Sequence, residues 1–143
     1  MSGLPEIRAL YDAYLETALA LEADRKPGQG LLGFGKKPAD DPCHPQFAED
    51  LRVALAELEA EDPDSARRRA VLELILFAPT EHREPLSVYW MLVAVHGLTP
   101  SLIRGLDPAD AAALGDRYGK TYPRWERLPI QKDVFRALKQ QMR

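Results

Sequence analysis

The most constraining feature of the sequence is an unbroken apolar run of eight residues, 88–95. In a helix such a run presents apolar side chains on every side, and a helix of that kind is surrounded at the centre of a domain. The run is far shorter than the roughly 20 apolar residues that a membrane-spanning helix needs. A buried strand would fit the same run, but the sequence offers no second strand to pair with it. We therefore predict a central helix.

Helical periodicity continues through the rest of the chain. Apolar residues recur at steps of three and four, which places one apolar stripe along each helix. Asp-Pro pairs at 62–63 and 107–108 are typical helix starts, with an aspartate cap before proline at the first helical position. We predict an all-α, single-domain bundle of six to seven helices over residues 1–143, with the third and fourth helices as its central pair. The expected helices cover residues 4–24, 45–60, 63–78, 85–97, 100–105, 108–119 and 130–142.

A long stretch rich in glycine and proline, residues 25–44, interrupts this pattern. Glycine raises the entropy cost of order and proline lacks a backbone donor, so neither helix nor strand is expected there. Connections of this length are usually functional or disordered. Residues 30–37 match most of a phosphate-binding loop, but Lys37 stands where a Ser or Thr is needed and no strand precedes it. We interpret the stretch as a flexible connection and predict no cofactor.

Few residues are suited to metal binding or nucleophilic catalysis. Cys43 is the only cysteine, and the histidines are His44, His82 and His96. Zinc ligands usually come in close pairs, and adjacent Cys43 and His44 on an extended loop would point apart. His96 precedes Gly97, where it is expected to complement the carboxyl end of a helix. No complete catalytic constellation is present, so a non-enzymatic role is favoured and no metal site is predicted.

The cysteine count and the first residues bear on location. A single cysteine rules out an intramolecular disulfide. Residues 1–7 show no basic segment followed by an apolar run, so no signal peptide is expected. With no membrane-spanning segment either, the expectation is the reducing cytoplasm.

Charge is distributed unevenly along the chain. Residues 1–96 carry 10 Lys/Arg and 17 Asp/Glu, whereas residues 97–143 carry 9 Lys/Arg and 5 Asp/Glu. The net charge of −3 therefore conceals a basic carboxyl-terminal third. This asymmetry indicates either an anionic partner or attraction between the two parts within the fold.

The most informative stretch, residues 117–127, interleaves aromatic and basic side chains. Aromatic rings beside guanidinium groups are what stacking on bases and neutralising phosphates require. The last helix adds cations at steps of three and four, which would share one face and could follow a phosphate backbone. The same residues also suit a structural role, with the rings pinning the connection to the core and arginine stems covering them. The candidate binding residues are Arg117, Lys120, Tyr122, Arg124, Trp125, Arg127, Lys132, Arg136 and Lys139.

Three hypotheses for function follow. The first is a small interaction or regulatory module with a protein as its expected partner, because the surface is charge-polarised and no catalytic constellation is complete. The second is a nucleic-acid-binding protein that uses residues 117–143. The third is an enzyme or small-molecule binder with a site at residues 25–44, including Cys43 and His44. No membrane partner is expected, and no oligomeric state is predicted.

Overall fold

The structure, a computed structural model, describes residues 3–23, 43–81 and 86–143. Within these ranges the chain forms helices joined by turns and contains no strand, as the periodicity predicted. Most of the predicted loop at residues 25–44 lies outside the described residues. The helices are α1 (Leu4–Ala23), α2 (His44–Ala60), α3 (Ser65–Glu81), α4 (Leu86–Ala94), α5 (Pro100–Ile103), α6 (Pro108–Thr121) and α7 (Pro129–Gln141), with 3-10 turns η2 (Val95–Leu98) and η3 (Arg124–Glu126).

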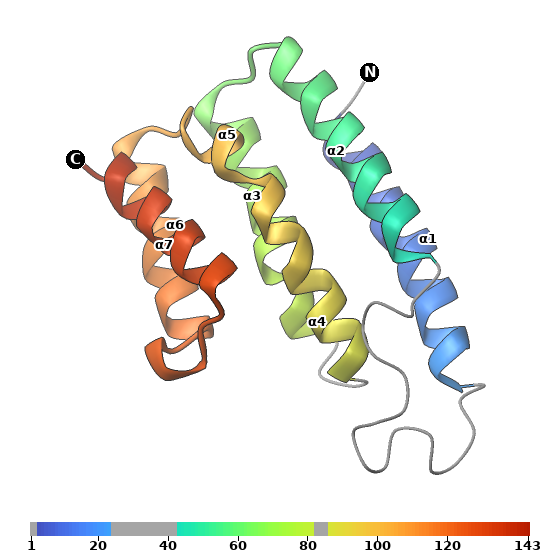
Figure 1. The fold of residues 1–143 in the computed structure, drawn as a ribbon. Coiled ribbons are helices and arrows are strands. Elements are labelled where there is room, and N and C mark those ends of the chain that lie inside the picture. The colour runs from blue at the N-terminus through green and yellow to red at the C-terminus, as the bar shows by residue number, and fades with distance from the viewer. Residues whose placement is uncertain (1–2, 24–42, 82–85) are drawn as a thin grey trace.

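The helices form three layers that lie side by side (Figure 1). Helices α1 and α2 pair on one side, α6 and α7 pair on the other, and α3, α4 and α5 lie between them. Helix α3 contacts α1 and α6 in the two outer layers, and α4 contacts α1 and α7. The predicted central position of these two helices is therefore confirmed.

The apolar run predicted at the centre forms most of α4 and enters η2. Val88 and Leu92 are buried, as expected of a central helix. The run is not covered on every side, however, because Tyr89 and Trp90 are partly buried and Ala94 is exposed. One edge of α4 is accessible to solvent, contrary to the prediction that the run is surrounded.

Helix α3 begins two residues beyond the predicted start at 62–63. Asp62 has a left-handed backbone with φ 50°, so the chain is still turning at this position. The cap is instead Asp64, whose Oδ1 accepts a 2.9 Å hydrogen bond from the backbone N–H of Arg67. The Asp-Pro pair at 107–108 opens α6 as predicted, although the aspartate side chain makes no capping hydrogen bond.

Two helices continue past their predicted ends. Helix α3 runs through Pro79. The missing N–H of Pro79 leaves the carbonyl of Ile75 without its usual helical partner, but does not end the helix. Helix α6 passes Gly119, where a Cβ would lie 3.3 Å from Cε1 of Phe135. Gly119 therefore allows α7 to approach α6 closely, and it does not act as a stop signal.

Aromatic side chains pack against one another within the two outer layers. Tyr11 and Tyr14 of α1 pack on Phe47 of α2, with ring centroids 5.0 and 4.3 Å apart. At the carboxyl end of α6, the ring centroids of Tyr118 and Tyr122 are 4.7 Å apart. Each aromatic pair contributes about 0.5–1.5 kcal/mol beyond its burial, so these contacts stabilise each outer layer.

Candidate functional site

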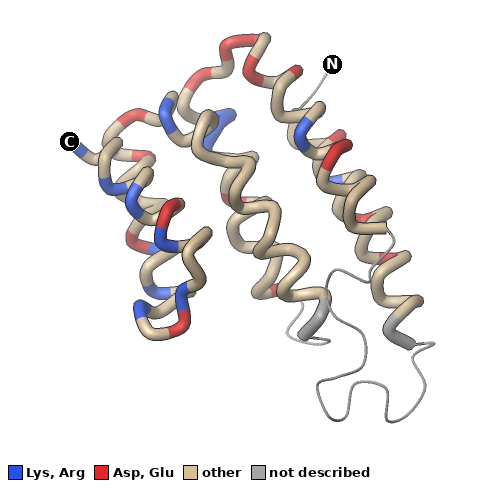
Figure 2. Tube along the Cα trace, in the orientation of Figure 1, with Lys and Arg blue, Asp and Glu red and all other residues tan. Residues whose placement is uncertain are grey.

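The nine predicted binding residues lie on α6, α7 and the connection between them, where Lys and Arg are interspersed with Asp and Glu (Figure 2). Neighbouring side chains engage several of these cations. Lys120 Nζ lies 3.0 Å from the carboxylate of Asp116, and Arg136 Nη1 lies 3.2 Å from that of Asp133. The guanidinium of Arg117 lies 3.9 Å from the centroid of an aromatic ring of α3. These three cations are therefore already partnered within the fold.

Three more predicted residues contact groups within the fold, two of them at the α6–α7 connection. Arg127 and Lys139 lie over the ring of Phe135, 4.2 and 5.0 Å from its centroid. Arg127 Nε also donates a 2.7 Å hydrogen bond to the carbonyl oxygen of Tyr122. Tyr122 is buried, and its hydroxyl donates to the carbonyl oxygen of Leu76 in α3. This part of the segment has the structural role that was weighed against nucleic-acid binding.

The remaining three predicted residues project into solvent. The Trp125 side chain is 82% exposed, which is unusual for so large an apolar group. Arg124 and Lys132 are exposed, and neither has an ion-pair partner in the described part of the chain. Six of the nine predicted residues thus have a partner in the fold, although four of these six are still exposed, and the other three are exposed and have no such partner in the described ranges.

The sequence had suggested that Cys43 and His44 lie on an extended loop, but the structure places them at the start of α2. Cys43 is the N-cap residue of α2, and His44 is the first residue of the helix. His44 Nε2 lies 3.1 Å from the carbonyl oxygen of Met91, which ties α2 to α4. In the described ranges, no group of three or more His, Cys, Asp and Glu residues is placed to hold a metal ion. The rest of the hypothetical site at residues 25–42 is outside the described residues.

His96 is fully buried and does not complement a helix end, contrary to the prediction. Its Nδ1 lies 3.1 Å from the hydroxyl oxygen of Tyr118. Burial lowers the pKa of His96 to about 4. The backbone of Ile75, whose carbonyl has no helical partner because Pro79 lacks an N–H, raises this pKa, but by less than burial lowers it. Nε2 makes no hydrogen bond of ordinary geometry within the described residues. The ring is therefore neutral at pH 7 and has no charge to offer a helix dipole.

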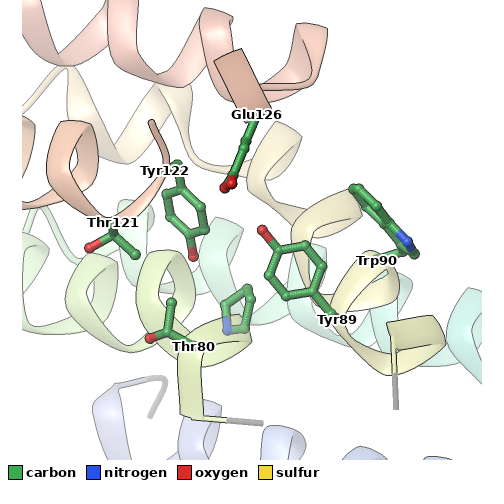
Figure 3. Close-up of a pocket in the computed structure, with 7 residues that line it drawn as sticks. Thr80, Tyr89, Trp90, Thr121, Tyr122 and Glu126 are labelled. Atoms are coloured by element: carbon green, nitrogen blue, oxygen red, sulfur yellow. The ribbon is translucent and has the colours of Figure 1, made fainter. Parts of the chain in front are cut away.

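A cavity of about 770 Å³ opens where the carboxyl end of α3, the start of α4 and the α6–α7 connection meet (Figure 3). Figure 3 shows the carboxylate of Glu126 and the hydroxyl group of Tyr89 directed toward the same space, while the Tyr122 hydroxyl turns toward α3, where it donates to the carbonyl oxygen of Leu76. Glu126 is the one charged residue in the described lining. We call this site the Glu126 cavity, and its described lining is Pro79, Thr80, Tyr89, Trp90, Thr121, Tyr122 and Glu126.

Tyr89 forms one wall of the Glu126 cavity. Burial raises the pKa of Tyr89, the nearby carboxylate of Glu126 raises it further, and the side-chain amide of Gln131 acts in the opposite direction. The phenol is therefore neutral at pH 7 and available as a hydrogen-bond acceptor or donor. The rings of Tyr89 and Trp90 meet edge to face, with centroids 5.2 Å apart and planes at 82°.

A second hollow, of about 600 Å³, shares Trp90 with the cavity. Its walls come from α4 and from the start of α7, and they are apolar except for Asp133, which Arg136 engages. We call this hollow the Trp90 groove, and its described lining is Trp90, Met91, Val93, Ala94, Leu128, Pro129, Ile130 and Asp133. The accessible edge of α4 therefore joins a polar cavity to an apolar groove.

Sequence reasoning did not identify these two hollows. One signal was present, because Tyr89 and Trp90 have polar tips in an otherwise aliphatic run. Consecutive helical positions lie 100° apart, so these two bulky residues point in different directions and their polar tips call for solvent or a polar neighbour on more than one side of the helix. No comparable signal marked Glu126, which lies far away in the sequence and reaches Tyr89 only through the fold.

None of the described helices is long and apolar enough to cross a membrane. No protein-family model, curated protein or solved structure matches the chain.

Proposed function

We propose that the protein is an interaction module that binds a segment of a protein partner in the Trp90 groove and the adjoining Glu126 cavity. The observation that carries this proposal is the meeting of the two hollows at Trp90 on the open edge of α4. Tryptophan, tyrosine and methionine are enriched at the centres of protein interfaces, and the walls here contain Trp90, Tyr89 and Met91.

The form of the Trp90 groove also suits a peptide. An apolar groove between two helices is a common receptor for a short helix or an extended segment with apolar anchor residues. Hollows that bind such groups usually measure about 300–1,000 Å³, and the volume of about 600 Å³ falls in this range. The partner would bury apolar anchors against the partly exposed side chains of Trp90 and Ile130, which closes the exposed side of the central layer.

The experiment is a selection from a random 12-residue peptide library displayed on phage, with the purified protein as bait. Ala94 lines the groove and is exposed, so Ala94→Arg should fill the groove without disturbing the core. Ala13 is exposed in the middle of α1, so Ala13→Arg is a matched control. We expect selected peptides to lose about tenfold or more in affinity to Ala94→Arg, because an apolar anchor is worth about 1.4 kcal/mol or more.

Selected peptides should bind the Ala13→Arg variant as tightly as the unchanged protein. Two outcomes would contradict the proposal: no enriched peptide, or peptides whose binding both variants reduce equally. Thermal unfolding of each variant shows whether an affinity loss arises from misfolding.

One observation favours nucleic-acid binding as a second candidate function. Trp125 is 82% exposed beside Arg124, so its ring is available for stacking on an unpaired base. A single-stranded oligonucleotide should then quench tryptophan fluorescence, and the binding should weaken steeply as salt is added. Trp125→Ala should abolish the binding. Quenching that is absent at low salt, or that survives this substitution, would eliminate the candidate.

A further inference from the structure

The Glu126 cavity has a feature that the Trp90 groove lacks, an acidic group without an ion-pair partner among the described residues. Glu126 is exposed and forms no ion pair with any described residue. Two arginines flank it in sequence, but Arg127 is engaged by Phe135 and by the carbonyl oxygen of Tyr122. Arg124 is two residues away in the 3-10 turn η3, and positions two apart in such a turn point to different sides. The cavity thus has a negative charge and no cation in its described lining.

The other walls of this cavity add to the attraction for a cation. The faces of Tyr and Trp rings attract cations through their quadrupoles. Tyr89, Trp90 and Tyr122 all line the cavity, and the hydroxyl group of Tyr89 points into the same space as the carboxylate (Figure 3). A planar guanidinium can donate two parallel hydrogen bonds to a carboxylate and lie flat on an aromatic ring. An anionic ligand, by contrast, would be repelled by Glu126.

We propose that the Glu126 cavity receives an arginine side chain of the bound partner, while apolar residues next to that arginine occupy the Trp90 groove. This rests on the proposed function and specifies the partner as a segment that combines arginine with apolar anchors. The cavity, at about 770 Å³, has room for the arginine side chain and part of its flanking chain. Thr80 and Thr121 also line the cavity, and the Thr80 hydroxyl donates a 2.7 Å hydrogen bond to the carbonyl oxygen of Phe77.

The test uses pools of synthetic peptides that differ at one fixed central position, with the other positions randomised among Leu, Ile, Phe, Ala, Ser and Gly. The fixed residue is arginine, or its neutral isostere citrulline, or glutamate. Retention on the immobilised full-length protein is measured by mass spectrometry. We expect the arginine pool to be retained at least tenfold more strongly than the citrulline pool, and the glutamate pool least of all. Equal retention of the arginine and citrulline pools would overturn the arginine proposal.

A variant pair locates the effect in the cavity. Glu126→Gln removes the charge at an exposed position and should reduce retention of the arginine pool to the level of the citrulline pool. Glu16 is an exposed acid on α1, so Glu16→Gln is the matched control and should change neither pool. An arginine preference that survives Glu126→Gln would overturn the assignment to this cavity.

The outcomes separate this inference from the proposed function. If the pools are retained equally, but Ala94→Arg releases both, the groove binds peptides and the arginine pocket is wrong. If Ala94→Arg releases neither pool, the proposed function itself fails. Free arginine amide is the third arm, and we expect it to compete at least tenfold less well than an arginine peptide. Equal competition would show that the cavity binds a small organic cation, and would overturn the proposal that it receives an arginine side chain of a bound partner segment.

Discussion

Hydroxyl and carboxylate groups lie at both ends of α3. At the amino end the carboxylate has partners within the fold, and at the carboxyl end it faces an open cavity. At the amino end, the Ser65 hydroxyl donates to Asp110 and accepts a 2.8 Å hydrogen bond from the backbone N–H of Asp107. Arg69 there bonds to Glu73 at 2.9 Å and to Asp110 at 3.0 Å. At the carboxyl end, Pro79 and Thr80 open into the Glu126 cavity, where the acid has no described partner.

This difference separates stability from binding. Where every donor and acceptor is partnered, a substitution leaves a group unsatisfied and the free energy of unfolding falls. Where a polar group faces an open cavity, its substitution changes what can bind there and costs little stability. The predictions below test this division, from the largest expected effect to the smallest.

Arg68→Ala should be the most destabilising change. The Arg68 side chain is buried, and its guanidinium pairs with Glu59 and donates a 2.9 Å hydrogen bond from Nε to the carbonyl oxygen of Pro63. Removing one partner of a buried ion pair costs about 3–5 kcal/mol, which urea unfolding would measure. Arg67 is exposed and pairs with Glu61, so Arg67→Ala is the control and should cost about 1 kcal/mol or less. Equal losses would contradict the division between a partnered interior and a tolerant surface.

His96 should make the protein less stable in acid, with an effect of about 3 kcal/mol. The unfolded chain binds a proton at His96 with a pKa of 6.5, whereas the folded chain does so only at about 4. Between these values the unfolded state binds more protons, so this contribution to stability is complete above pH 6.5 and is lost as pH falls to about 4. A shift of this size corresponds to about 3 kcal/mol.

Urea unfolding of the unchanged protein and of His96→Gln, at several pH values from 7 to 4, would measure this contribution. Subtracting the free energy of unfolding of one protein from that of the other removes the contribution of the carboxylates, because these titrate in both. The advantage of the unchanged protein should shrink by about 3 kcal/mol across the window. A difference that stays constant with pH would show that His96 is accessible to protons in the folded state.

Gly105→Ala should cost about 2 kcal/mol, because a Cβ there would lie 2.3 Å from the guanidinium carbon of Arg68. The buried arginine is held by its partners and has little room to move. In the Arg68→Ala background the same change should cost about 0.5 kcal/mol or less, because the obstructing group is gone. A double-mutant cycle by urea unfolding measures this coupling. Equal costs in both backgrounds would mean that Gly105 acts through its own backbone.

The helices were predictable because their apolar stripes are local features of the sequence. The predicted helix ends were wrong where contacts between residues far apart in the sequence determine the structure. Pro79 stays inside α3, and Gly119 is helical beneath the ring of Phe135. The candidate site was harder to predict for the same reason. Tyr122 and Trp125 belong to one short aromatic and basic segment, yet one is buried in the core and the other is 82% exposed. Composition cannot distinguish them, because burial depends on which residue faces α3.

Glu126→Gln should have the smallest effect on stability, within about 0.5 kcal/mol of the unchanged protein. The side chain is exposed and has no ion pair to lose in the described residues, so the folded and unfolded states treat the substitution alike. Trp125→Ala should also be nearly neutral, because a side chain that is 82% exposed buries little apolar area. Urea unfolding checks both. A loss of about 2 kcal/mol from Glu126→Gln would place this carboxylate with the partnered groups at the other end of α3, and its role would then be to hold the fold together.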